Sequence, residues 1–414
     1  MTNPNRLSKP PSFTKRSSPR QVNEQAGQIR GANMLDAAEH NKKLVLQTIR
    51  ADGPITRPEI AELTGLTAPS IYTITKGLLA RDLLRGAGRT SGDRGQPATP
   101  LAVNPGGAFS LGLNVDRDHI TLVVLDFAGQ QRATFSQEIK FALPDYVRQF
   151  VSESLAEVVN SGLIPKDKIA GIGVALPDDL GRVRLPGQPA AFSAWTEVKA
   201  ETFLADITDI PVRVENDAAA AAIGEMHFGG GLESDSFFYV LISAGLGGGL
   251  VINRHYVRGA HGRSGEIGFL PKVNPFRPRR SDLRHTVGDT VLLSELYDDL
   301  YEQGVLARSP ADLAALPPAQ LHLTDPWVES VADHLYLPIL TLFCGIDPDA
   351  IYIGGRLPPV LLDKLCLALN ARLSHNLDVA WSKMIVRPAR LGQNPAAVGA
   401  AILSFEGLWQ HGER

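Results

Sequence analysis

From residue 107 onward, short apolar strands alternate with helical segments, and the same order occurs twice along the chain. The first occurrence consists of two strands, a helix and a buried strand, at 109–115, 120–126, 146–159 and 169–175. The second consists of a hairpin, with strands at 236–242 and 250–254 joined across a glycine run as the turn, and a later strand at 350–355. Strands that alternate with helices predict sheets with parallel pairs covered by helices. The recurrence predicts two related lobes with a cleft between them, where small ligands usually bind.

The charge of the chain changes sign between its front and its body. Residues 1–100 contain 15 lysine and arginine residues against 8 aspartate and glutamate residues, whereas the rest contains 26 against 36. A basic front on an acidic body indicates that the two parts have different partners. Residues 1–33 lack hydrophobic periodicity and are rich in polar residues and proline, so we expect a disordered basic arm there. The predicted domains are therefore 1–33, 34–105 and 106–414.

The segment from 34 to 105 has the pattern of three helices followed by a strand pair. Apolar spacing favours a first helix. Thr56 and Glu59 form a capping box at the start of the second helix, and Thr67 caps the third. Two short helices joined across 64–67, followed by a loop rich in arginine and glycine between two strands, are typical of a winged helix-turn-helix.

The outward face of the third helix and the wing carry the candidate DNA contacts. Hydroxyl groups can touch base edges or phosphates, and cationic side chains can pair with phosphates. The predicted DNA-binding residues are Arg57, Thr67, Ser70, Tyr72, Thr73, Lys76, Arg89 and Arg94. A small helical bundle with a solvated third helix gives a similar pattern. The basic wing and the excess of positive charge favour DNA binding.

Four motifs in the body resemble those of the ROK family (repressors, open reading frames and kinases). They are Asn216-Asp217 after a strand, Ala244 to Gly249, the glycine pattern Gly259, Gly262, Gly265-Glu266 and Gly268, and Gly354-Gly355. The segment in front is similar to the DNA-binding domain of ROK repressors. The resemblance covers residue 35 to the end. It implies an actin-like fold of two ribonuclease-H-like lobes, with a hinge near residue 217 and a C-terminal helix that returns to the first lobe. Family members either phosphorylate sugars with ATP or bind sugars to regulate transcription.

The phosphate-binding motifs of the ROK kinases are altered here. Where the kinases have Asp-x-Gly-Gly-Thr, this chain has Asn114 in place of the aspartate and Asp116 and Arg117 in place of the glycines. The kinase aspartate helps to hold a metal, and the glycines let the backbone approach the phosphates. Ala244 replaces the threonine of the second phosphate loop. We predict that the chain is not an enzyme and uses no cofactor; the alternative is an ATP-dependent sugar kinase that retains a winged helix.

The sugar-binding motifs are partly retained. By the resemblance, Asn216 and Asp217 would hydrogen-bond sugar hydroxyls, and Asp217 is the base in the kinases, while Glu266 is the other sugar-binding carboxylate. A carboxylate can accept such hydrogen bonds without a catalytic role. A second interpretation makes Asp217 the N-cap of the helix that follows. The predicted ligand-binding residues are Asn216, Asp217, Gly265, Glu266, Phe269 and Asp178, and no catalytic residue is predicted.

Further departures from the family change the expected pocket. Phe269 stands where the family has a histidine, and residues 271–292 contain no cysteine, so the zinc site of the family is not expected. His285 is nearby, but one histidine makes no metal site. Phe269 adds an apolar wall and Asp178 an acceptor, which imply a ligand related to a sugar; basic or amide-bearing ligands stay open. Trp195 fits either core packing or stacking on a sugar ring.

The remaining features favour a cytoplasmic protein. No apolar run of about 18 residues is present, and residues 1–20 lack the apolar core of a signal peptide. We therefore predict a transcriptional repressor of carbohydrate-metabolism genes, in which a sugar-like effector between the lobes controls binding to operator DNA. A homodimer or a dimer of dimers is expected, because helix-turn-helix proteins bind paired half-sites. A third interpretation is an interaction protein that binds another protein.

Overall fold

The computed structural model describes residues 34–88, 99–178, 180–182, 188–199, 202–272, 286–376, 386–392 and 394–410. The predicted disordered arm (1–33), two predicted DNA contacts (Arg89 and Arg94) and His285 lie outside these residues. Among the helices described, none is long and apolar enough to cross a membrane.

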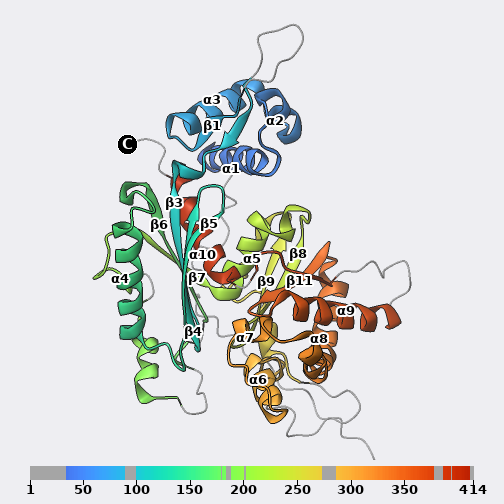
Figure 1. Ribbon diagram of the computed structural model, residues 1–414. Helices are drawn as coiled ribbons and strands as arrows, with labels where there is room; N and C mark the ends of the chain where they lie inside the picture. The colour runs from blue at the N-terminus through green and yellow to red at the C-terminus, as the bar shows by residue number, and fades with distance from the viewer. Residues whose placement is uncertain are drawn as a thin grey trace, which may run out of the picture.

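Three helices and a strand pair form a compact unit at the top of Figure 1, here called the head. Its elements are α1 (Met34–Asp52), α2 (Arg57–Thr64), α3 (Ala68–Ala80), β1 (Leu84–Gly86) and β2 (Leu101–Val103). The backbone N–H and the hydroxyl of Thr56 both donate to Glu59 Oε2, at 2.8 and 2.6 Å. Thr67 Oγ1 accepts the Ser70 N–H at the start of α3. The predicted caps and the antiparallel β1–β2 pair are present.

The first lobe is built on a five-stranded sheet with the order β5-β4-β3-β6-β7. Its strands are β3 (Phe109–Val115), β4 (His119–Asp126), β5 (Gln131–Glu138), β6 (Ile169–Leu176) and β7 (Val212–Asn216). The first three strands pair antiparallel, and β6 and β7 add to β3 in parallel. Helix α4 (Pro144–Asn160) covers one face, and its residues Val147 and Val151 are buried in the core of this lobe.

The second lobe repeats this topology with the order β10-β9-β8-β11-β12. Its strands are β8 (Phe237–Ile242), β9 (Leu246–Ile252), β10 (His255–Tyr256), β11 (Ala350–Gly355) and β12 (Val386–Pro388). Four helices complete the lobe: α6 (Leu293–Glu302), α7 (Pro310–Ala314), α8 (Asp325–Ile346) and α9 (Pro359–Asn376). Pairing directions match those of the first sheet, so the predicted repeat of two mixed α/β lobes is confirmed.

Two helices, α5 (Asp217–Phe228) and α10 (Pro395–Gln410), lie between the two sheets (Figure 1). Helix α10 packs on β3 and β6, where a β-carbon at Gly112 or Gly173 would overlap the carbonyl oxygen of Ala397 or Ala400 respectively. A β-carbon at Gly399 would likewise overlap the backbone of α5. Glycine is therefore required at these positions, because backbone touches backbone.

The hairpin of the second lobe differs from the sequence prediction. We expected residues 244–249 to form the turn and the second strand to begin at residue 250, but β9 begins at Leu246. A β-carbon at Gly247 would lie 2.8 Å from that of Ala218, and one at Gly249 would lie 2.5 Å from that of Ala222. These glycines let α5 approach the strand closely, so most of the run serves helix–strand packing and not a turn.

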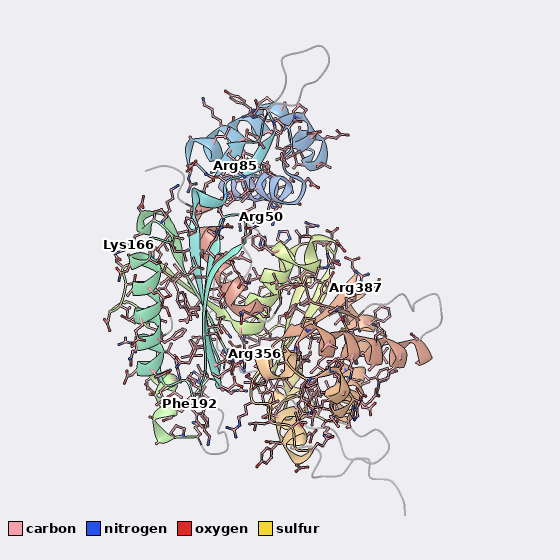
Figure 2. All side chains as sticks on the ribbon, viewed as in Figure 1. Arg50, Arg85, Lys166, Phe192, Arg356 and Arg387 are labelled. Carbon is pink, nitrogen blue, oxygen red and sulfur yellow. The ribbon has the colours of Figure 1, made fainter. Side chains whose placement is uncertain are left out.

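The head rests directly on the first lobe and on the ends of both central helices. Apolar side chains of the head share one buried cluster with residues of β4, α5 and α10. Arg50 of α1 donates to the Phe127 carbonyl at 3.0 Å, and its guanidinium lies 4.8 Å from the ring centre of Phe228 at the end of α5 (Figure 2). Arg81 donates to the Leu408 carbonyl of α10 at 2.7 Å. The head is thus fixed to the first lobe through its core.

Replacing Gly173 with alanine tests the backbone contact of α10. We expect Gly173→Ala to lower the free energy of unfolding by about 3 kcal/mol, because the new methyl group meets backbone atoms that cannot rotate away. Gly345→Ala in α8 is the matched control, since nothing lies within 4 Å of its β-carbon. It should raise the stability by up to about 1 kcal/mol. Thermal and denaturant unfolding measure both; equal effects would contradict the assigned role of Gly173.

Candidate functional site

A cavity of about 290 Å³ lies between the two lobes. Its walls come from the β3–β4 turn, the end of β6 and the β7–α5 junction on one side, and from the β8–β9 turn and parts of 266–292 on the other. The cavity brings together five of the six predicted ligand-binding residues: Asp178, Asn216, Asp217, Glu266 and Phe269. Gly265 is not in the lining. It has a φ of +96°, and a β-carbon there would overlap Gly248. Glycine is therefore needed here for the backbone conformation and for the close contact with β9.

The Asn216-Asp217 pair stands where β7 ends and α5 begins. Asn216 is the N-cap of α5, and its Oδ1 accepts the N–H groups of Ala218 and Ala219 at 3.0 and 3.1 Å. Asp217 is the first helical residue, and its Oδ1 accepts the Ala218 N–H at 2.8 Å. Capping therefore belongs to Asn216 and not to Asp217, which corrects the second interpretation of Asp217. The side-chain amide nitrogen of Asn216 is the group left for a ligand.

The electrostatics of the cavity are dominated by carboxyl groups. Among the described residues that line it, five are acidic and one is an arginine, Arg117; the acidic residues are Asp116, Asp178, Asp217, Glu266 and Asp289. Burial raises the pKa of Asp217 to about 7, and the nearby carboxylates of Asp116 and Glu266 add to the rise. The Ala218 N–H and the Arg117 guanidinium oppose it. Near neutral pH the Asp217 carboxyl group is therefore able both to donate and to accept a hydrogen bond.

Several lining residues were not predicted as ligand contacts. Asp289 and Thr286 come from the segment after 271, and the Thr286 N–H donates to Asp289 Oδ2 at 2.8 Å. No motif marks these two residues in the sequence, so spacing alone gave no signal for them. Asp116 and Arg117 were identified only as altered phosphate-loop residues, and the structure adds them to the wall of this cavity.

The two aromatic residues discussed from the sequence differ in position. Phe269 is 58% exposed and lines the cavity. Trp195 is buried against Phe203, with 5.1 Å between ring centres, and its indole N–H donates to the Ala142 carbonyl. Trp195 is absent from the cavity lining, so of the two interpretations core packing is the correct one.

The region around Asn114 has very little free space. The adjoining cavity has about 10 Å³, barely the volume of one water molecule, and is lined by Asn114, His119 and Asp217 among others. Asn114 Nδ2 lies 3.0 Å from His119 Nε2. Within the described residues, one group has metal-ligand spacing, namely Asp116, Asp118 and His119. Asp116 accepts the Arg117 N–H and the Ser243 hydroxyl, while Asp118 Oδ1 lies 2.7 Å from His119 Nδ1.

The exposed face of α3 carries a cluster of cationic groups around one tyrosine. Tyr72 is 55% exposed. The guanidinium of Arg57 and the ammonium of Lys76 lie 5.7 and 5.9 Å from its ring centre. Arg57 Nε also donates to Thr75 Oγ1 at 2.8 Å, which fixes its position between α2 and α3. Tyr72 and its two cations form a solvent-facing patch on the head.

The predicted hydroxyl contacts on this face are engaged locally. Thr67 Oγ1 and Ser70 Oγ are 2.9 Å apart at the cap of α3, and Thr73 donates to the Pro69 carbonyl at 3.0 Å. Each of these oxygens can still accept a hydrogen bond. Arg85 of β1 is exposed on the same head and is labelled in Figure 2. Arg85 is not among the DNA-binding residues predicted from the sequence.

The two sheets of equal topology, with a cavity between them, define a two-lobed α/β fold of the sugar-kinase type. Residues 110–280 match the model of the ROK family.

Two kinds of protein resemble the chain. The xylose repressor of Bacillus subtilis is 27% identical over 382 residues, which cover 88% of this chain and 95% of the repressor. A crystal structure of a ROK family transcriptional regulator, a homologue of the E. coli MLC protein, has a TM-score of 0.62 at 19% identity and covers 90% of this chain and 98% of that chain. A ROK family glucokinase from Streptomyces griseus, solved with glucose and AMPPNP, has a TM-score of 0.53 at 21% identity, with 72% and 99% covered. At these identities the solved structures support the fold.

Replacing Asp217 tests the raised pKa. The folded state holds this proton up to about pH 7, while the unfolded chain releases it near pH 4, so the group costs more stability as the pH rises between these values. Asp217→Asn should therefore stabilise the protein by about 1 kcal/mol or more at pH 8, and by less at pH 5. Thermal unfolding at the two pH values measures this.

The exposed Asp209, which lies outside the cavity, supplies the matched control. Asp209→Asn should shift the midpoint equally at both pH values. An Asp217→Asn advantage that does not grow between pH 5 and pH 8 would contradict a buried, proton-holding Asp217.

Proposed function

We propose that the protein is a transcriptional repressor of carbohydrate-metabolism genes, whose head binds operator DNA and whose interlobe cavity binds a small polyhydroxylated effector. The observation that carries this proposal is the combination on one chain of two features: a head with a solvent-facing patch of Arg57, Tyr72 and Lys76, and a carboxylate-lined cavity. The head is fixed to the first lobe through a shared core. The named repressor among the relatives matches over 88% of this chain, which is more than the ROK domain match alone covers.

The head is assigned as a winged helix-turn-helix DNA-binding domain over 34–105, followed by the ligand-binding body over 106–414. In this class of domain the second helix of the pair enters the major groove, which here is α3. Tyr72 supplies an apolar surface and a polar tip for base edges, while Arg57 and Lys76, which lie beside its ring, would pair with phosphates. Arg85 extends the positive face toward the wing.

The protein acts as a homodimer or as a dimer of dimers in this proposal. A single head of this kind covers one half-site, and two-fold related heads place their α3 helices about one helical turn of DNA, or a multiple of it, apart. The operator is therefore expected to be a pseudo-palindrome.

Substitution of Lys76 tests the DNA-binding face. Lys76→Ala should weaken binding to the promoter region of the protein's own operon about five- to tenfold at ~100 mM salt, and should reduce the slope of log K against log salt concentration by about 1. Arg57→Ala should act in the same direction. Fluorescence anisotropy with labelled duplexes over a salt series measures both quantities.

Lys199 gives a matched control, because it is an exposed lysine between η3 (Ala190–Glu197) and β7 of the first lobe, outside the head. Lys199→Ala should leave affinity and salt slope unchanged. Wild-type protein that binds a random duplex as tightly as the promoter region would contradict the proposal of a specific repressor.

The charge of the cavity restricts the effector. The five carboxyl groups among the described lining residues accept hydrogen bonds from hydroxyl or ammonium groups and repel phosphate. Arg117, the arginine within that described lining, already donates to the Ala244 carbonyl at 3.3 Å. We infer that the effector is a neutral or amino-bearing sugar or sugar alcohol, and not a sugar phosphate. A volume of about 290 Å³ suits a ligand of monosaccharide size.

A thermal-shift panel tests the effector class. Free pentoses, hexoses, sugar alcohols and amino sugars are compared with the corresponding sugar phosphates. A bound member should stabilise the protein by about 2.7 kcal/mol at 100 times its dissociation constant, whereas the phosphates should give no shift. Glu266→Gln should reduce the shift, and Asp209→Asn, outside the cavity, should not. A phosphate that shifts the midpoint as much as its free sugar would contradict the charge argument.

The kinase alternative has less support from the contacts. A triphosphate needs an open seat with donors or a metal near Asn114, and the space there is about 10 Å³ and bordered by Asp116. An assay for hexose-dependent ATP hydrolysis decides this point, since turnover that is lost in Asp217→Asn would establish the enzyme.

A further inference from the structure

Polar contacts join the two lobes beside the effector cavity. The turn between β3 and β4 of the first lobe provides Asp116, whose Oδ2 accepts the hydroxyl of Ser243 at 2.8 Å. Ser243 belongs to the β8–β9 turn of the second lobe. Arg117 Nη1 donates to the carbonyl of Ala244, in the same turn, at 3.3 Å. Asp116 is 3% exposed, so its hydrogen bond is shielded from water and is costly to break.

A buried arginine makes the third crossing. Arg356 follows β11 in the second lobe, where its backbone N–H donates to the Ile242 carbonyl at 2.9 Å. Its side chain pairs with Glu138 at the end of β5, in the first lobe, and lies 3.7 Å from Asp118 Oδ1. Only 9% of the Arg356 side chain is exposed. A buried guanidinium without a carboxylate partner is strongly unfavourable, so the lobes cannot separate while Arg356 stays buried without leaving this charge unpaired.

The crossings adjoin the cavity wall. Asp116, Arg117, Ser243 and Ala244 all line the 290 Å³ cavity, which takes its remaining lining from both lobes. The cavity is therefore complete only while the lobes stay at their present angle. A ligand there touches the same atoms that hold the lobes together.

We propose that these crossings form an interlobe latch, which holds the lobes closed without any bound nucleotide and sets the fraction of molecules able to bind the effector. The latch consists of three pairs, Asp116–Ser243, Arg117–Ala244 and Arg356–Glu138. This inference rests on the proposed function for the role of the effector, whereas the latch itself is a property of the free protein. Weakening the latch populates an open form and lowers the apparent affinity in proportion to the closed fraction.

The latch is tested by measuring the distance between the lobes in the free, full-length protein. Spin labels are placed at Glu157→Cys on α4 and Ala371→Cys on α9, both exposed, in a Cys344→Ser background that removes the exposed native thiol. Double electron–electron resonance then gives the distance distribution. In the otherwise wild-type protein we expect one main distance, with a longer-distance population below about 10%. In Arg356→Ala that population should rise several-fold.

Arg372→Ala is the matched control, because Arg372 pairs with Glu329 and Asp333 inside the second lobe. It should leave the distribution unchanged. An Arg356→Ala distribution identical to that of the wild type would overturn the latch. If Arg356→Ala does not fold, the double variant Ser243→Ala with Glu138→Gln replaces it, and an unchanged distribution there overturns the latch equally.

A second arm separates the latch from the effector proposal. The panel member with the largest thermal shift is titrated against wild type and Arg356→Ala, and its affinity should fall at least threefold in the variant, but not in Arg372→Ala. An altered distance distribution with no panel member bound would support the latch and contradict the effector role. Affinity that is unchanged in an opened variant would contradict the coupling of the latch to the cavity.

Discussion

The contact of α10 with β3 and β6 fixes the geometry on which the cavity and the head both depend. Backbone meets backbone at Gly112 and Gly173, and the same helix meets α5 at Gly399. Such contacts leave no side chain that can adjust, so the two central helices and the first sheet behave as one rigid block. Helix α5 starts at the cavity with Asn216 and ends beneath the head, where His227 lies 3.5 Å from Gln47 of α1.

The same block explains why buried charge is tolerated near the cavity. Carboxyl groups are gathered at the β3–β4 turn and at the start of α5, where burial alone favours their neutral form. Asp217 responds by holding its proton, whereas Asp116 is satisfied by the Ser243 hydroxyl and the Arg117 N–H. The desolvation of Asp217 is thus offset by protonation, and that of Asp116 by hydrogen bonds. In both cases the surrounding groups are held in place by the rigid packing.

Much of this architecture can be predicted from the sequence, because it rests on local patterns. The caps at Thr56 and Thr67 and the repeated order of strands are each indicated by patterns within short stretches of residues. The glycine run before Leu250 was misassigned, since a close helix–strand contact and a tight turn demand the same residue. The order of residues in the sequence alone does not distinguish a close helix–strand contact from a tight turn.

The candidate site was predictable only in part, for a related reason. Five of the six ligand candidates line one cavity. Asp178, Asn216 and Asp217 lie at or just after the ends of β6 and β7, whereas Glu266 and Phe269 come from the connection after β10 and were marked by the family resemblance. Asp289 and Thr286 could not be found, as they reach the cavity through the path of a long connection. The crossing of Arg356 to Glu138 joins residues more than two hundred positions apart, and no spacing rule links them. The proposed DNA contacts stay predictions, with Arg89 and Arg94 outside the described residues.

The seating of Arg50 against Phe127 and Phe228 means that the head is carried by the first lobe. A rotation of one lobe against the other therefore moves α3 together with the first lobe, although no contact within the head changes. In an assembly that anchors the second lobe, a small rotation near the cavity would become a large change in the separation of paired heads. The rigidity of the contact between the head and the first lobe would then determine how strongly effector binding changes DNA binding.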